Sequence, residues 1–271
     1  MVTMTAVPST SGLERLTALM GDIAVREAPP GGPPAEAWWP LARAVDRMRE
    51  RLDRVEAGVG RRDVATSFLG GWAVAPIVQV TTAPALVDRD LVPVAAGDVH
   101  LRAHPGGWFD GIALSGAGHV VRGGDLEARW ARQAAEVLTP VLAAVHEAGE
   151  RFGLRGLWGN AVVDRVVWTA TDLAERGYGD ARTLVRRAQD LLDALEPLAP
   201  VRLTRARTMD VEGPAGSVTF LVKSACCLLY RTIPPRLRSH GEYCTGCPII
   251  PDEGRPVRWR AYLAGKADAG D

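Results

Sequence analysis

The chain has 271 residues, of which 47% are apolar and 24% are charged, and its formal net charge is zero. This length allows one large or two modest domains with a real core, and the composition is ordinary for a soluble globular protein. Because nothing in the charge balance favours binding through bulk electrostatics, we expect no nucleic-acid partner.

The first part of the chain predicts two helices separated by a linker. Ser11-Gly-Leu-Glu14 has the pattern of a capping box and leads into an apolar run, which predicts a helix to about Val25. The segment from Pro29 to Pro34 predicts a linker. A second helix is expected where apolar residues recur at helical spacing, namely at Leu41, Val45, Met48, Leu52 and Val55.

The stretch from Val64 to Val87 has no charged residue and is long enough to span a bilayer. It also contains Gly70, Pro76 and Pro84, so we expect a buried helix to about Ala75, followed by a strand or loop, and no integral membrane segment. No secretory signal is visible in the first residues. The expected location is the cytoplasm, with a peripheral position at the inner face of the membrane as an alternative.

Short β-prone runs separated by Pro, Gly and Asp then predict a small, mainly antiparallel sheet. These runs are Ile77–Val80, Leu91–Val94, Val99–Ala103 and Trp108–Leu114. Trp108 and Phe109 are expected in the core of this sheet rather than in a ligand site.

Helical periodicity returns in three segments, from Leu126 to Val145 with a bend or break at Pro140, from Leu157 to Glu175, and from Asp180 to Leu195. Two strands, Val201–Thr208 and Ser217–Lys223, are expected around a Gly213-Pro214 turn. The predicted fold class is α+β: a mainly helical body with a small antiparallel β-sheet over residues 1–199, and a short C-terminal module over residues 200–271.

All four cysteines lie in this C-terminal module, as Cys226-Cys227, sixteen residues, then Cys244-Thr-Gly-Cys247. Such clustering indicates a shared role, for which three explanations are available. Disulfides are disfavoured in the reducing compartment expected here, and adjacent cysteines cannot join without strain. Structural zinc suits four thiolates, and Cys244-x-x-Cys247 would serve as one half of a zinc site.

Adjacent cysteines are the weak point of the zinc explanation. Their side chains diverge on a strand and lie about 100° apart on a helix, so both converge poorly on one ion. A [2Fe–2S] cluster is larger and offers two iron atoms, so it accepts splayed cysteines more easily. The pattern favours the cluster over zinc and over disulfides, and it does not decide which iron each cysteine binds.

At this point the sequence resembles a known family. Ser224-Ala-Cys-Cys-Leu-Leu-Tyr-Arg231 followed by Tyr243-Cys-Thr-Gly-Cys-Pro248 resembles the C-terminal signature of FhuF-like ferric siderophore reductases. Less specific similarity appears in Arg62-Asp-Val-Ala-Thr-Ser-Phe-Leu69 and in Leu154-Arg-Gly-Leu-Trp-Gly-Asn160. The resemblance implies that Cys226, Cys227, Cys244 and Cys247 ligate a [2Fe–2S] cluster.

The resemblance implies an oxidoreductase of iron homeostasis that delivers single electrons to a ferric siderophore and so releases Fe(II). The alternative is a ferredoxin-like electron relay, or a cluster-bearing binding or sensor protein with another acceptor. One departure is the sixteen-residue loop between Cys227 and Cys244, against about ten in the family. Because loop closure costs grow slowly with length, ligation should survive, and the solvent exposure of the cluster and its partner become doubtful.

Cations flank the cysteines, and four of them are candidates to dock an anionic ferric chelate or an acidic electron donor: Arg231, Arg236, Arg238 and His240. No G-x-G-x-x-G at a strand-to-helix junction and no Walker A motif occurs, so a separate ferredoxin or flavoprotein is expected to supply electrons. The remaining histidines show no metal-ligand spacing and are expected to be structural, namely His100, His104, His119 and His146.

Overall fold

The computed structural model describes residues 10–29, 37–56, 61–116, 119–149, 152–213, 216–232 and 243–269. Its main helices are α1 (Thr10–Met20), α2 (Leu41–Glu56), α3 (Arg62–Val87), α4 (Leu126–Gly149), α5 (Leu154–Trp158), α6 (Asp164–Glu175), α7 (Ala181–Leu195) and α8 (Arg255–Ala269). The strands are β1 (Ala24–Glu27), β2 (Trp38–Pro40), β3 (Val99–Ala103), β4 (Phe109–Leu114), β5 (Arg207–Gly213) and β6 (Gly216–Val222). The expected α+β class, mainly helical, is confirmed.

Short helical turns connect these elements. They are η1 (Ala96–Asp98), η2 (Gly159–Val163), η3 (Glu196–Leu198), η4 (Leu229–Thr232) and η7 (Asp252–Gly254). Of these, η2 is a π-helical turn, and the others are 3₁₀ turns.

The long helix α3 runs through the helical body and packs against α1, α2, α4, α6 and α7. It continues through Pro76 and Pro84, so the predicted helix end near Ala75 is wrong, and so is the predicted strand Ile77–Val80. Each proline removes one backbone donor, which normally weakens a helix. Here the apolar side chains surround the whole helix, and neighbouring helices hold it on several sides.

Helix α3 has the length and apolar composition to cross a membrane, but 78% of its apolar window is buried inside the protein. Among the residues that the structure describes, it is the one helix that meets those criteria. Burial of this kind is that of a core helix, which makes a soluble protein plausible.

The four-stranded sheet has the order β1-β4-β3-β2, with β1 parallel to β4 and the other pairs antiparallel. The predicted run Val99–Ala103 is β3, and β4 falls within the other predicted run, whereas Leu91 forms only an isolated bridge with Val121. The sheet is therefore mixed rather than purely antiparallel. Its two outer strands, β1 and β2, were not predicted.

The first helix ends earlier than expected, because Gly21 follows it with a φ of 60°. This left-handed conformation is the usual stop at a helix C-terminus, and glycine adopts it without a steric penalty. Val25, expected at the end of the helix, lies in β1 instead. The predicted linker falls on residues 29–34, of which 30–34 lie outside the described residues.

The other helix predictions hold with two modifications. Helix α2 covers the expected apolar stripe, α4 continues through Pro140 without a break, and α7 begins after Asp180, whose carboxylate accepts the Thr183 amide at 2.8 Å. The segment expected as one helix from Leu157 to Glu175 is α5, η2 and α6 in succession.

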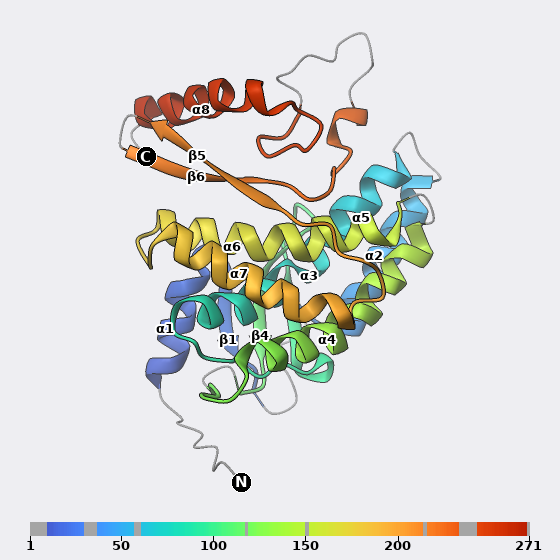
Figure 1. Cartoon of the computed structure of the whole chain (residues 1–271). Helices are drawn as coiled ribbons and strands as arrows, with labels where there is room; N and C mark the ends of the chain where they lie inside the picture. Colours follow the sequence, from blue (N-terminus) through green and yellow to red (C-terminus); the bar gives the residue numbers. More distant parts are fainter. Residues whose placement is uncertain are drawn as a thin grey trace.

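The hairpin of β5 and β6 lies over α6, and α8 packs across its other side (Figure 1). Val211 and Val222 of the hairpin form a small separate core with Trp259 of α8, whose ring stacks on Phe220 with a centroid distance of 4.6 Å. The first strand begins at Arg207, later than predicted, and α8 was not predicted. The predicted turn at Gly213-Pro214 is only partly described, and a domain boundary near residue 200 stays a prediction.

Candidate metal centre

The cysteine pair lies directly after β6, where the chain leaves the hairpin, and η4 follows it. Leu228, the next residue, has a φ of 60°, which is uncommon for a bulky side chain. In this conformation the Leu228 amide donates to Cys226 Sγ at 3.4 Å. The backbone at the cysteine pair is therefore neither a regular strand nor a regular helix.

The second pair lies in the loop before η7. The Cys247 amide donates to the Cys244 carbonyl at 2.9 Å, which closes the Cys244-Thr-Gly-Cys247 turn. This turn is held against the end of β6, because the Lys223 amide donates to the Gly246 carbonyl at 2.9 Å. A side chain at Gly246 would lie 2.5 Å from the Leu221 carbonyl oxygen, so the close approach requires glycine.

The structure brings the four thiols together without a disulfide. Cys227 Sγ lies 3.9 Å from Cys244 Sγ, and the Cys247 thiol lies close enough to those of Cys244 and Cys226 to share their charge. Two thiolates on one tetrahedral zinc ion, each at about 2.3 Å from the metal, lie roughly 3.8 Å apart. The sulfurs of Cys227 and Cys244 therefore have the spacing of two ligands of one metal. The donor set therefore fits a thiolate-bound metal group.

The sulfur contacts run in series, from Cys227 to Cys244 to Cys247 to Cys226, and do not surround a single point. Within the described ranges, no three His, Cys, Asp or Glu side chains are arranged to hold a single metal ion. That result gives no support to a one-ion site, and the spacing of Cys227 and Cys244 stands as the observation in favour of a metal group.

Proton sharing between the thiols follows from these contacts. The hydrogen bond from Cys244 lowers the pKa of Cys227 to about 6, and the charge of Lys223 acts in the same direction. The pKa of Cys244 is raised by its contacts with Cys227 and Cys247, because two neighbouring sulfurs resist carrying charge together. Cys227 and Cys247 are nearly buried, whereas Cys226 and Cys244 are half-buried.

The π turn η2 supports the cysteine loop from the helical body. Asn160 donates to the Ser67 hydroxyl at 2.7 Å and accepts from Lys223 Nζ at 3.5 Å. Gly159 also packs against Ser224 and Ala225, and Arg231 binds Asp63, so the start of α3, η2 and the first cysteine segment lie together. The sequence-based interpretation made Asn160 a local hydrogen-bonding residue without a mechanistic role, whereas its partner Ser67 lies far away in the chain.

Asp164 is a second support that the sequence did not reveal. It is 3% exposed, and its Oδ1 accepts the Ser224 amide at 2.6 Å, which fixes the chain two residues before Cys226. Its Oδ2 has no hydrogen bond in the described part of the protein. Burial raises the pKa of this carboxyl to about 6, although the Ser224 amide opposes the shift.

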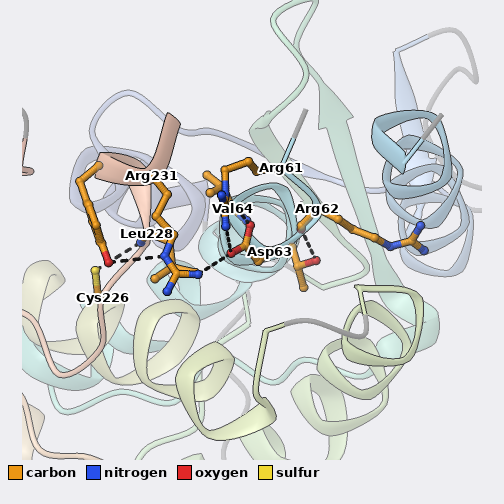
Figure 2. A network of polar contacts seen from close by, with 9 residues as sticks. Arg61, Arg62, Asp63, Val64, Cys226, Leu228 and Arg231 are labelled. Carbon is orange, nitrogen blue, oxygen red and sulfur yellow. Dashed lines mark hydrogen bonds and ion pairs between the residues drawn. The ribbon is translucent and has the colours of Figure 1, made fainter. Parts of the chain in front are cut away.

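Arg231 is the one candidate docking cation that the structure describes. It donates to Asp63 at 2.7 Å, and the same carboxylate accepts from Arg61, as Figure 2 shows at the start of α3. These two arginines and the Val64 amide hold the pKa of Asp63 at about 2, against the opposing effect of burial. Arg236, Arg238 and His240 lie outside the described residues, and the docking role of all four stays a prediction.

The histidines expected to be structural are described without a metal-ligand arrangement. His146 Nδ1 lies 2.9 Å from the Phe152 carbonyl oxygen, and the His104 ring stacks on Trp108 at 4.0 Å.

No protein-family model matches the sequence, and a search of curated proteins found no match either. The family resemblance therefore depends on the sequence motifs alone.

Gly159→Ala should lower the free energy of unfolding by about 1 to 2 kcal/mol, because a new Cβ would lie 2.9 Å from both Ala225 Cβ and Ser224 Oγ. Alanine otherwise suits this helical position, so packing against the cysteine loop outweighs its better helix propensity. Chemical denaturation checks the result. Gly153→Ala is the control, since no atom lies within 4 Å of its new Cβ. Equal stability of the two variants would contradict the close packing of η2 on the cysteine loop.

Asp164→Asn should remove a pH dependence of stability. A carboxyl whose pKa rises from 3.8 to about 6 on folding binds a proton more tightly in the native protein. The wild type should therefore lose up to about 3 kcal/mol of stability from this group as the pH rises from about 4 to about 6. The difference between the two proteins in urea unfolding, measured at several pH values, isolates that contribution, because all other carboxyls are common to both. A constant difference across this range would show that Asp164 is not perturbed.

Proposed function

We propose that the protein is a cytoplasmic oxidoreductase that reduces a ferric siderophore through a [2Fe–2S] cluster held by Cys226, Cys227, Cys244 and Cys247. The observation that carries this proposal is the meeting of the two cysteine pairs, with Cys227 Sγ 3.9 Å from Cys244 Sγ. Cys227 and Cys244 come from two separate segments of the sequence, and the fold holds their sulfurs in contact. Shared ligation of one metal group requires this arrangement.

The chain's own residues supply the conditions that a thiolate site needs. Lys223 favours the thiolate forms of Cys227 and Cys244, and its positive charge offsets part of the negative charge of four thiolates. The Leu228 amide donates to Cys226 sulfur, which stabilises charge on that atom. Such N–H···S contacts also set the potential of an iron–sulfur centre.

When bound, the cluster supplies one electron at a time. The substrate is Fe(III) in a chelate of hard oxygen donors, which hold Fe(III) far more tightly than Fe(II). One electron reduces the iron, the Fe–O bonds weaken, and a cellular acceptor can take the Fe(II). A separate ferredoxin or flavoprotein returns the electron, because the sequence has no nucleotide-binding motif.

An anaerobic visible and EPR spectrum before and after dithionite tests the cluster. Addition of a ferric siderophore to the reduced protein, with Fe(II) trapped by a colourimetric chelator, then tests the acceptor. We expect a cluster signal that changes on addition of dithionite. We also expect the ferric siderophore to reoxidise the reduced cluster. A cluster that no ferric siderophore oxidises would instead indicate the electron relay. Colourless protein that contains zinc and no iron would indicate a structural zinc site.

A further inference from the structure

A cavity of about 930 Å³ lies between α2, the first half of α3 and the turn that joins β3 to β4. Its size is that of a small-molecule site. Thr232 of η4 also lines it, so the cavity reaches the segment that follows the cysteine pair. None of the residues assigned above to the metal centre lines this cavity.

The wall of the cavity is unusually aromatic. Its rings are Trp39, Phe68, Trp72, Trp108 and Phe109. Trp72 and Trp108 lie 6.3 Å apart between ring centroids, and Phe68 lies 5.7 Å from Trp72. Trp108 is 40% exposed, so the expectation that it packs in the sheet core is wrong, whereas Phe109 is buried as expected. Exposed indole faces offer stacking surfaces for flat rings.

The charged residues of the described lining are all arginines, namely Arg47, Arg51 and Arg61. Arg51 donates to the Gly107 carbonyl at 2.5 Å, and Arg47 pairs with Glu50 at 2.7 Å. A guanidinium has more N–H donors than these contacts use, so both arginines can also bind an anion. Arg61 shares one carboxylate, Asp63, with Arg231, which leaves an excess of positive charge at that end of the cavity.

The same ion-pair network joins the cavity to the cysteine loop. Arg231 follows the cysteine pair in η4 and reaches Asp63, and Asp63 also binds Arg61 in the cavity wall (Figure 2). A ligand in the cavity would therefore lie beside the segment that leaves the metal centre. This contiguity links the cavity to the chemistry proposed for the four thiols.

We infer that this cavity binds the ferric complex of an aromatic, anionic chelator of the catecholate class. The inference rests on the proposed function, which makes a ferric chelate the substrate. A ferric ion surrounded by catecholates carries a net negative charge and presents flat rings, whereas one surrounded by hydroxamates is neutral and need not present any ring. Arginines bind the first kind of surface and indoles stack on its rings, so charge and shape both favour the catecholate.

Binding can be measured apart from electron transfer with gallium(III), which has the charge of Fe(III) and accepts no electron under these conditions. The probes are the gallium(III) complexes of a tripodal catecholate and of a tripodal hydroxamate, each titrated calorimetrically into the purified full-length protein. We expect the catecholate complex to bind at least about tenfold more tightly, with an affinity that falls as salt is raised. Equal or tighter binding of the hydroxamate complex would overturn the ligand class.

Variants of residues in the cavity wall test whether the ligand binds in this cavity. Trp108→Ala should weaken binding of the gallium catecholate about tenfold, because it removes an exposed stacking face. Arg61→Gln should weaken it and reduce the salt dependence. Trp168→Ala is the matched control, since this indole is 38% exposed on α6 and lies outside the cavity. Wild-type affinity in both Trp108→Ala and Arg61→Gln would overturn the location.

A cluster-deficient variant separates this inference from the proposed function. Cys247→Ser should bind the gallium catecholate with nearly wild-type affinity, because no cysteine lines the cavity. If the cluster-loaded wild type binds the gallium catecholate but reduces no ferric chelate, the reductase function fails while the ligand class of the cavity stands. If reduction is efficient and the gallium catecholate does not bind, the cavity inference fails alone.

Discussion

Cys247→Ser should abolish most of the iron–sulfur signal while the helical body stays folded. Serine is nearly isosteric with cysteine, but its oxygen is a poor replacement for a thiolate at iron. Cys247 is 2% exposed, and its thiol contacts both Cys244 and Cys226, so its loss interrupts the chain of sulfur contacts at its centre. We expect at least about a tenfold loss of visible absorbance and EPR intensity after anaerobic reconstitution, because even changes outside the ligand set typically cost about 10- to 100-fold in metal affinity or activity.

The main apolar core contains none of the four cysteines, which is why the helical content should not change. Thr245→Ala is the matched control, since this exposed residue lies between the two cysteines of the same turn. Circular dichroism measures the helical content, and the iron content per chain measures ligation. Full colour in Cys247→Ser, and likewise in the other three Cys→Ser variants, would contradict the ligand assignment.

The sequence predicted most helices because their apolar residues recur at a helical spacing that burial then uses. The stripe of α2 and that of α7 are examples, and Leu191 and Leu192 of α7 lie in the core as that pattern requires. Helix α3 defeated the same reasoning, since its apolar residues surround it and give no periodic stripe. Without such a stripe, Pro76 predicts the end of the helix. In the structure, tertiary packing keeps the helix continuous through this proline.

The sheet was only half predicted for a related reason. The strands β3 and β4 are a neighbouring antiparallel pair with alternating burial in β3, which local pattern can show. The parallel partner β1 is a four-residue strand far away in the chain, and its pairing with β4 is a property of the fold. Likewise α8 has a weak apolar stripe, and its position depends on Trp259 packing on the hairpin.

The four thiols were identified from the sequence because cysteine is rare in the chain and its clustering is visible. The residues that position them were not. Asn160 and Asp164 come from the far side of the boundary expected near residue 200, and they reach the cysteine loop only because the π turn η2 lies beside it. Neither residue has a partner at a short sequence separation, so spacing alone could not assign it a role.

Arg255→Met should destabilise the second cysteine turn by roughly 3 kcal/mol and increase cluster loss. Arg255 is 1% exposed, donates to the Cys247 carbonyl at 2.8 Å and also donates to the Ile250 carbonyl. Methionine fills much of the space but leaves these buried carbonyl groups without a donor, and each such group costs about 1 to 3 kcal/mol. The effect should be local, because the separate small core around Trp259 holds α8 on the hairpin.

The rate of cluster loss under an iron chelator measures this effect directly, and hydrogen exchange of the β5 and β6 amides reports unfolding of the hairpin. Arg260→Met is the matched control, because this arginine is exposed on the same helix α8. Arg255→Lys should fall between the two, since an ammonium keeps the charge but cannot reproduce the planar fork that bonds two carbonyls and Asp252 together. If Arg255→Met keeps both the wild-type stability and the wild-type rate of cluster loss, then Cys247 is positioned by its own turn, and the buried guanidinium has no part in holding the fourth thiolate.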